Sequence, residues 1–377
     1  MAESENSKSE VAIRPVFLTD KTILSEYRIF LRRMLAGLAG EAHIAAIAGP
    51  AGEDMESVLC PSVEHIRHPA IGLCFLRRTN RMMLLEKLAK FRPTVLHGFW
   101  PGCGDLLCFL SARLEIPYVQ TFLAPVGRFS RIAVEPAYAG ALLGPCDTIY
   151  QSLLRRRPKL SERIEKVHIG GFVEDDCACF SNPGRKVGLL VVDRLDNAAL
   201  FEPLLRAVRH LLLDGFEVEL MILGQGGGER GIRRMVRSLR LTQSVTIVPP
   251  MRSLRAIFSG ADVFIHLRDA GRFNMALLEA VSVGLALAGC ADQTTGLMLE
   301  DGSAAIFDPA DELSIYDSLR GLLSRSEDGR KTAIEGQGRL SRDCSVSGML
   351  EQLMQIYRRV QQWYGESRQD AAAAVKQ

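Results

Sequence analysis

Short runs of apolar and β-branched residues alternate along most of this chain with longer segments of helical periodicity. In the second half, the runs VGLLVV, VELMIL and SVTIV begin at Val187, Val218 and Ser244, and each is followed by a segment of helical pattern or a turn leading to one. Parallel strands need a crossover connection between them, and that connection is usually a helix. The alternation therefore predicts an α/β fold with parallel sheets.

The domain organisation follows from the length and from one break in this rhythm. A chain of 377 residues exceeds what one hydrophobic core normally supports. Between residues 172 and 186, three acidic residues, a proline and a glycine cluster without periodicity, which indicates a linker. The expected parts are a disordered leader at 1–10, an N-terminal domain at 11–171, the linker at 172–186, a C-terminal domain at 187–364 and a flexible tail at 365–377.

The positions of individual elements are predicted from the same pattern. In the first half we expect strands at residues 13–18, 43–48, 94–99, 118–122, 148–150 and 166–169. In the second half, further strands are expected at 262–267 and 285–289, with helices at 199–213, from 229, near 254 and at 274–283. Open parallel sheets bind ligands at the carboxyl ends of their strands, so the site is expected in a cleft between two such domains.

Charge and cysteine usage exclude several classes of function. Lys and Arg number 46 against 44 Asp and Glu, a balance that disfavours a nucleic-acid-binding protein. The nine cysteines are scattered without CxxC spacing, and Cys177 and Cys179, one residue apart, are too weak a motif to predict a metal site. This cysteine usage and a polar start without a signal peptide favour a reduced, cytoplasmic location.

Four blocks of the second half resemble, in order and spacing, the C-terminal domain of retaining GT-B glycosyltransferases of family 4. They read VVDRLDNAALFEPLLRAV, VELMILGQGGGERGIRRMVRSL, SVTIVPPMRSLRAIFSGADVFIHL and FNMALLEAVSVGLALAG. In the first half, TVLHGFWPGCGDLLCFLSARLEIPYVQTF and KVHIGGFVEDDCACF resemble the family more loosely. The resemblance spans nearly the whole folded chain and implies two Rossmann-like domains facing a cleft.

The resemblance also implies donor-binding residues in the second half. Arg194 stands where the family has its donor-site arginine, and Glu279 stands where a carboxylate holds the ribose hydroxyls. The turn of Phe273, Asn274 and Met275 opens a helix whose N–H groups are suited to phosphates. Each has a plainer interpretation: a solvated strand-end arginine, an N-cap asparagine, and a glutamate paired with a neighbouring arginine.

Three family positions carry a different residue here. Gly271 replaces a glutamate that contacts the transferred sugar, Ala199 replaces the diphosphate lysine, and Leu123 replaces a histidine of the N-terminal domain. Nearby residues could replace the missing groups. Asp269 could reach the sugar hydroxyls, Arg272 or Arg268 could supply the positive charge of the lysine, and His97 lies at a strand end that faces the expected cleft. As catalytic candidates, His97 and Asp269 have a plainer alternative, core hydrogen bonding for the first and an irregular surface loop for the second.

The glycine-rich segment GQGGGERG, residues 224–231, follows a strand and opens a helix. Its glycines do not fit GxGxxG, and no acid follows in the region where a dinucleotide-binding protein needs one, so an oxidoreductase is disfavoured. Two interpretations remain open. The segment borders the donor cleft as a flexible turn, or it is a simple loop that requires positive φ.

The expected function is sugar transfer with retention, from a nucleoside diphosphate sugar to a hydroxyl acceptor on a glycan or a lipid-linked molecule. No cofactor is expected and no metal, because the resemblance implies neither and no DxD pair stands at a suitable strand end. The alternative is a non-catalytic GT-B protein that binds a nucleotide, a glycan or an enzyme partner.

Two basic amphipathic stretches in the first half, 27–38 and 74–91, fit peripheral contact with an anionic membrane, at its inner face. Ordinary surface helices with an apolar face in the core would show the same pattern. Their bases are Arg28, Arg32, Arg33, Arg77, Arg78, Arg81, Lys87 and Lys90.

Overall fold

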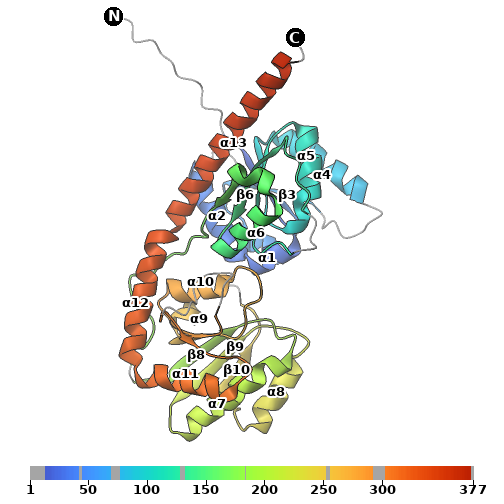
Figure 1. Cartoon of the computed structure of the whole chain (residues 1–377). Coiled ribbons are helices and arrows are strands. Elements are labelled where there is room, and N and C mark those ends of the chain that lie inside the picture. Colours follow the sequence, from blue (N-terminus) through green and yellow to red (C-terminus); the bar gives the residue numbers. More distant parts are fainter. Residues whose placement is uncertain are drawn as a thin grey trace, which may run out of the picture. The chain divides into compact units, whose positions relative to one another are not determined.

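The computed structural model describes residues 13–41, 45–68, 77–127, 132–182, 184–251, 255–291 and 302–374. The chain forms two compact units (Figure 1). Unit 1 contains residues 1–145, 149–167 and 347–377, and unit 2 contains residues 146–148 and 168–346. Each is a parallel sheet flanked by helices, which confirms the predicted α/β class with two Rossmann-like domains.

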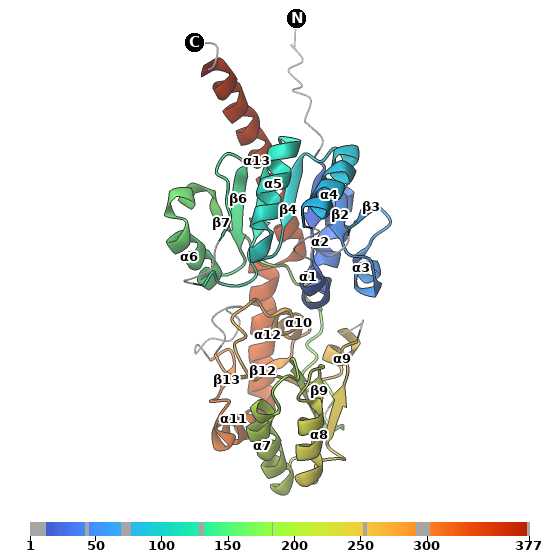
Figure 2. The ribbon, with the colours of Figure 1, turned by 90° about the vertical axis from the view of Figure 1, so that its right-hand side faces the viewer.

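Unit 1 is built on a seven-stranded sheet of order β3-β2-β1-β4-β5-β6-β7, in which every neighbouring pair is parallel. The strands are β1 Pro15–Leu18, β2 Ala45–Gly49, β3 Val63–Arg67, β4 Val95–Gly98, β5 Tyr118–Thr121, β6 Ala139–Gly144 and β7 Ile164–Lys166. The α-helices are α1 Lys21–Glu26, α2 Arg28–Glu41, α3 Glu53–Val58, α4 Arg77–Phe91, α5 Gly104–Leu114, α6 Asp147–Arg156 and α13 Val346–Ala374. Short 3₁₀ turns are η2 Pro101–Cys103 and η3 Pro158–Arg163. Helices α4 and α5 lie side by side over the sheet (Figure 2).

Unit 2 repeats the plan with a six-stranded parallel sheet of order β10-β9-β8-β11-β12-β13. Its strands are β8 Val187–Val192, β9 Val218–Leu223, β10 Val245–Val248, β11 Val263–His266, β12 Ala286–Gly289 and β13 Ala305–Ile306. Its helices are the 3₁₀ turn η4 Ala198–Phe201, α7 Glu202–Leu213, α8 Glu229–Ser238, α9 Arg255–Ser259, α10 Met275–Ser282, α11 Glu312–Ser324 and α12 Ser326–Asp343.

Burial explains why the apolar runs became the central strands. All four residues of β11 and of β12 are buried, as expected for strands covered on both faces. Helix α7 buries Leu204, Leu205, Val208 and Leu211, a spacing that presents one apolar face to the sheet. The core of unit 2 is therefore formed by the strands and by one side of each covering helix.

Asp262 ties the expected linker segment to this sheet. Its carboxylate, 2% exposed, accepts hydrogen bonds from the backbone N–H of Phe180 at 2.7 Å and of Gly188 at 2.8 Å. The guanidinium of Arg185 also donates to it at 2.9 Å. A buried carboxylate is tolerated when it is paired and hydrogen-bonded in this way. Residues 172–182 and 184–186 accordingly belong to unit 2.

Two predicted strands differ from the structure. The strand expected at 166–169 overlaps β7 only at Lys166, and the strand expected at 148–150 is wrong. Residues 148–150 lie in helix α6, because Ile149, Ser152 and Leu153 form its buried face while Asp147 occupies the first turn and Arg155 the last turn. An acidic start and a basic end suit the helix dipole. The sequence TIY is rich in strand-forming residues, but the amphipathic pattern extends beyond it and determines the structure.

The C-terminal end is organised differently from the expected boundaries. Helix α13 continues without interruption through much of the predicted tail, and residues 347–377 group with unit 1. Two glycines of unit 1 accommodate it: a Cβ at Gly37 would come within 2.1 Å of Leu350, and one at Gly140 within 2.2 Å of Val360. The expected leader, residues 1–10, lies outside the described residues.

Candidate functional site

The strand order of unit 2 reverses between β8 and β11, because the chain moves outward from β8 through β9 to β10 and then returns to β11 on the other side. Open α/β sheets bind their ligands outside the carboxyl ends of the strands at such a point. The residues concerned are 193–197, which follow β8, and 267–274, which follow β11. We call these two segments the unit 2 edge.

A bidentate ion pair joins the two segments. The guanidinium of Arg268 donates to both carboxylate oxygens of Asp193, with N–O distances of 2.7, 3.0 and 3.2 Å. Asp193 is 15% exposed and Arg268 is 37% exposed, and the hydrogen bond to Asp193 raises the pKa of Arg268. Planar ion pairs with two hydrogen bonds, as here, fix the position of one side chain relative to the other. Arg268 therefore holds the ends of β8 and β11 together, which removes it as a ready substitute for the missing lysine charge.

Arg194, the predicted donor-site cation, lies in the same place but is held more loosely. Its side chain is 59% exposed and its Nε donates to Asp196 at 2.8 Å, while its backbone N–H donates to Asp193 at 2.7 Å. Exposed ion pairs contribute little stability. Replacing the Asp196 carboxylate with a phosphate as the partner of the Arg194 guanidinium would therefore cost little free energy.

Asn274 caps helix α10. Its Oδ1 accepts from the backbone N–H of Ala276 at 3.0 Å and of Leu277 at 3.1 Å, and its amide contacts Nδ1 of His266 at 3.2 Å. Two of the N–H groups that were expected to face phosphates are thus taken by the cap, so the plain N-cap interpretation describes the structure. The side chains of Phe273 and Met275 are buried, 5% and 7% exposed.

Glu279 lies in α10, about one and a half turns beyond its cap. It is only 4% exposed, and its neighbours Leu278 and Ala280 are also buried. A carboxylate in such surroundings is costly unless its oxygens are matched by donors. The structure places Glu279 and Asn274 on one short helix that starts from the unit 2 edge.

Asp269 and Gly271 form a tight turn on the way to α10. The carboxylate of Asp269 accepts from the backbone N–H of Gly271 at 2.8 Å, and Gly271 has φ +65°. A Cβ at Gly271 would meet no atom within 4 Å. Asp269 is exposed and Arg272 is half-buried in the same loop. The three residues share the edge, where Asp269 also shapes the turn.

The glycines after β9 are needed for close approach and not for positive φ. Gly224, Gly226 and Gly228 are absent from the positive-φ residues, but a Cβ at each would come within 1.9, 2.4 and 2.7 Å of backbone atoms of Asp193 or Leu195. The expected requirement for positive φ is therefore wrong. These glycines let the loop at 224–228 pack directly against the segment that carries Arg194, which supports the interpretation that the loop borders the edge.

His97, the other catalytic candidate, is a core residue of unit 1. Its ring is fully buried, with Nδ1 at 2.6 Å from the hydroxyl of Tyr357 and Nε2 at 2.8 Å from that of Thr121. Burial lowers its pKa to about 3, so the ring is neutral. Both nitrogens are engaged within the core, as in the core interpretation. Leu123 is also buried, 3% exposed.

The basic residues of unit 1 divide into exposed and engaged groups. Arg33 is 8% exposed, Arg28 lies 3.9 Å from Asp54, and Arg81 stacks over the ring of Phe109. These three bases are therefore engaged within the fold. Exposed bases are Arg32, Arg78, Lys87 and Lys90, although Lys87 also donates to the carbonyl of Arg67 at 2.6 Å. Position 74 lies outside the described residues, and α4 begins at Arg77.

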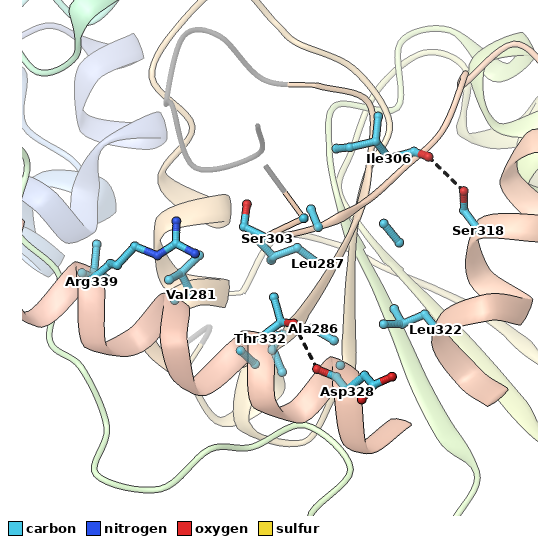
Figure 3. Close-up of a pocket in the computed structure, with 18 of the residues that line it drawn as sticks. Val281, Ala286, Leu287, Ser303, Ile306, Ser318, Leu322, Asp328, Thr332 and Arg339 are labelled. Atoms are coloured by element: carbon cyan, nitrogen blue, oxygen red, sulfur yellow. Dashed lines mark hydrogen bonds between the residues drawn. The ribbon is translucent and has the colours of Figure 1, made fainter. Parts of the chain in front are cut away.

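A cavity of about 600 Å³ lies elsewhere in unit 2. It is lined by β12, β13, α11, α12 and the end of α10, and Arg339 extends from α12 toward Val281 (Figure 3). Ser318 donates to the carbonyl of Ile306 at its rim. None of the residues predicted from the sequence lines this cavity. The cavity and the predicted donor residues are therefore separate features of unit 2.

Two acids of the site were not predicted. Asp193 pairs with Arg268 and Asp196 pairs with Arg194. With Asp269 and Arg272, the two segments of the edge carry three acids and three bases. The signal available in the sequence was the alternation Asp-Arg-Leu-Asp at 193–196. This sequence shows that charges of both signs follow β8, but it does not show with which arginine each aspartate forms an ion pair.

Comparison with known proteins places this geometry in context. Residues 180–339 match the family model of glycosyl transferases group 1. Among curated proteins, none matches the sequence. In the described part of the chain, no helix is long and apolar enough to cross a membrane.

Solved structures resemble nearly the whole chain in fold. A glycosyltransferase from Rickettsia africae ESF-5 has a TM-score of 0.76 at 12% identity, covering 93% of this chain and 99% of its own. Anabaena HepE in complex with UDP-glucose has a TM-score of 0.75 at 12% identity, with 91% and 98% covered. Sucrose-phosphate synthase from Thermosynechococcus elongatus has a TM-score of 0.70 at 15% identity, with 92% and 99% covered. Residues 180–339 therefore match the glycosyl transferases of group 1, and nearly the whole chain has the fold of these glycosyltransferase structures.

Proposed function

We propose that this protein transfers a sugar, with retention of anomeric configuration, from a nucleoside diphosphate sugar to a hydroxyl acceptor. The observation that carries the proposal is the group 1 match over residues 180–339, which includes both segments of the unit 2 edge. Anabaena HepE, a structural neighbour, is described in complex with UDP and with UDP-glucose. We therefore propose a uridine diphosphate sugar as the first donor to test.

In this proposal the donor lies along the unit 2 edge. Arg194 releases Asp196 and binds the diphosphate, Arg272 contributes a second cation, and Glu279 accepts hydrogen bonds from the ribose hydroxyls. Asp269 contacts the transferred sugar. Cations and donors aimed at a leaving diphosphate stabilise the charge that develops on it in the transition state. No metal is proposed at the diphosphate.

A non-catalytic function is the second candidate, and the charges at the edge favour it specifically. Each of Arg194 and Arg268 is already paired with an aspartate, so a diphosphate must displace a carboxylate or bind beside it. Ala199 and Gly271 stand where the family supplies a lysine and a glutamate. A protein with these groups would bind nucleotide weakly and turn over slowly or not at all.

Calorimetry with a panel of nucleoside diphosphates tests the donor site. We expect binding in the micromolar to millimolar range, with UDP among the ligands, and we expect Glu279→Gln to weaken it by about 1–3 kcal/mol. Arg230→Ser, on the exposed face of α8, is the matched control and leaves the affinity unchanged. Absence of binding by every nucleoside diphosphate, in folded protein, contradicts both candidate functions at this edge.

Hydrolysis of the donor separates the two candidates. An active transferase releases diphosphate slowly from a nucleotide sugar even without an acceptor, whereas a binding protein does not. Glycans and lipid-linked sugars are then supplied as acceptors, and the anomeric configuration of the product is read by NMR. A product of inverted configuration contradicts retention while leaving the donor site intact.

A further inference from the structure

Cys177 and Cys179 form a close thiol pair inside unit 2. Their Sγ atoms lie 3.5 Å apart, with Ala178 between them in the sequence. Their side chains belong to the core of unit 2, and the residues are 6% and 0% exposed. Neither the fold nor the proposed donor site requires two cysteines here. Among the described residues, no group of three potential metal ligands occurs that could include them.

The pair sits on a segment docked against the end of α10. Residues 174–180, which we call the strap, donate three backbone hydrogen bonds to this end: Glu174 to Ser282 at 2.9 Å, Ala178 to Val283 at 3.0 Å and Cys179 to Gly284 at 3.0 Å. Gly284 has φ +72°, and a Cβ there would lie 3.0 Å from Cys177 Cα. The contact is therefore too close for a side chain at this position.

Arg330 places a positive charge beside the two thiols. Its guanidinium donates to the carbonyl oxygens of Cys177 at 3.0 Å and Cys179 at 2.6 Å. The hydrogen bond from Cys179 is the largest cause that lowers the pKa of Cys177, the Arg330 charge acts in the same direction, and burial opposes both, which leaves this pKa at about 7. The thiolate is the nucleophilic form of cysteine, so this arrangement makes Cys177 the reactive member of the pair.

We propose that Cys177 and Cys179 are a reversible dithiol–disulfide site that is oxidised by a peroxide. The Cys177 thiolate attacks one peroxide oxygen, the O–O bond breaks, and the second oxygen leaves and is protonated to water. The resulting sulfenic acid is attacked by the Cys179 sulfur, the S–S bond forms, and the hydroxyl leaves as a second water. Two electrons pass from the sulfurs to the peroxide, and both thiol protons end in water.

The strap changes when the bond forms. A disulfide is about 2.05 Å long, so the sulfurs approach by about 1.5 Å within a loop of three residues. The backbone N–H of Ala178, between the two cysteines, donates one of the three hydrogen bonds to the end of α10, and we expect disulfide formation to displace it. Since α10 carries Asn274 and Glu279, oxidation is expected to weaken nucleotide binding. This consequence alone rests on the proposed function.

Peptide mapping tests the site directly in the full-length protein. Trypsin cleavage after Lys166 and Arg185 yields a peptide that contains these two cysteines and no other. After treatment with hydrogen peroxide and thiol alkylation, this peptide should lack two hydrogens and both alkyl groups, and dithiothreitol should restore alkylation of both thiols. Cys344→Ser should leave the result unchanged, whereas Cys179→Ser should leave Cys177 as a sulfenic or sulfinic acid.

Two outcomes overturn the proposal: a peptide alkylated at both thiols after peroxide, or one in which each sulfur is oxidised without a bond between them. Arg330→Gln should slow oxidation of the pair without slowing that of Cys344. UDP affinity is then compared between reduced and oxidised protein. If UDP binds the reduced protein, an intact disulfide with unchanged affinity contradicts the coupling to α10. If UDP does not bind, the donor site is contradicted, and the peptide mapping still decides whether the disulfide forms.

Discussion

The hydroxyl of Tyr357 lies 2.6 Å from Nδ1 of His97, although 260 residues separate the two in the sequence. Both are fully buried in unit 1, where the Thr121 hydroxyl takes the other ring nitrogen. The hydrogen bond links helix α13 to strand β4. An imidazole between two neutral hydroxyls in an apolar interior has nothing to stabilise its charged form, and this has a consequence for stability against pH.

Unit 1 should lose stability as the pH falls below 6.5. The pKa of His97 is about 3 in the folded protein against 6.5 for an unperturbed histidine, so the unfolded chain takes up a proton that the folded chain does not. Stability present above pH 6.5 is lost at about 1.4 kcal/mol per pH unit on the way to pH 3. His68, whose pKa is lowered by burial and by Lys87, acts in the same direction.

Urea unfolding at pH 7.5 and 5 measures this effect. Both tryptophans, Trp100 and Trp363, are in unit 1, so their fluorescence reports this unit. The variant His97→Gln keeps hydrogen-bonding groups but does not titrate. Between pH 7.5 and pH 5, its free energy of unfolding should fall by about 2 kcal/mol less than that of the wild type. An equal loss in both proteins contradicts the assignment of the pH dependence to His97.

The packing of α13 on unit 1 is tested at two glycines. Alanine at Gly140 would place its Cβ 2.2 Å from the stiff, β-branched Val360, so we expect a loss of about 1–3 kcal/mol. Gly365 lies within α13, and a Cβ there would meet no atom within 4 Å, so alanine should gain about 0.5–1 kcal/mol by helix propensity. A neutral result at Gly140 contradicts this packing of α13.

Asp262 should be one of the most sensitive positions of unit 2. Asp262→Ala leaves the N–H groups of Phe180 and Gly188 without their acceptor and removes the partner of Arg185, so we expect a loss of about 3 kcal/mol or more. Asp196→Ala, at an exposed ion pair, is the control and should cost no more than about 1 kcal/mol. Circular dichroism during urea unfolding measures both. Similar small losses contradict the role given to Asp262.

Restoring the family residues at the edge should have unequal effects. Ala199 is exposed at the start of η4, so Ala199→Lys is accommodated and should strengthen binding of UDP. Gly271 has φ +65°, and glutamate there strains the backbone by about 1–2 kcal/mol even though its side chain has space. Calorimetry and thermal unfolding distinguish these effects. Unchanged UDP affinity in Ala199→Lys contradicts a diphosphate site near this position.

Helices and strands whose apolar residues form a clear pattern in the sequence could be predicted from it, and the others could not. Strands β8 and β9 match the predicted runs because both are apolar segments bounded by turns. Strand β6, AGALLG, has few strand-forming residues, and β3, VEHIR, buries only Val63 and Ile66, a spacing that does not follow the strand period of two. Their places in the sheet depend on neighbouring strands, which local propensity does not contain.

The candidate site shows the same division. Glu279 and Asn274 could be located because they lie on one helix with a recognisable cap and apolar flanks. The role of Arg268 could not be predicted, since its partner Asp193 is 75 residues earlier and the two meet only when β8 and β11 pair. His97 was ambiguous for a similar reason, because the hydroxyl that engages Nδ1 belongs to a helix near the other end of the chain.

Helix α4 provides the last prediction, which concerns an anionic membrane surface. Its exposed residues include Arg78, Lys87 and Lys90 together with Met82 and Met83, which are 39% and 44% exposed. At 3.6 residues per turn, Met83, Lys87 and Lys90 share one side of α4, and Arg78 and Met82 lie on the adjoining side. Bases near anionic headgroups contribute about 1 kcal/mol each, and the two methionines add apolar contact. We propose that these exposed residues of α4 bind anionic vesicles.

Sedimentation with vesicles of phosphatidylserine and phosphatidylcholine, compared with phosphatidylcholine alone, tests the surface. Pelleting should require the anionic lipid, fall as salt increases, and be lost in the double variant Arg78→Ser/Lys90→Ser. Arg230→Ser/Arg234→Ser removes the same charge from exposed positions of α8 and should pellet like the wild type. Equal pelleting with neutral and anionic vesicles, or equal losses in both double variants, contradicts a specific role for α4, because the net charge of the chain would then explain the binding.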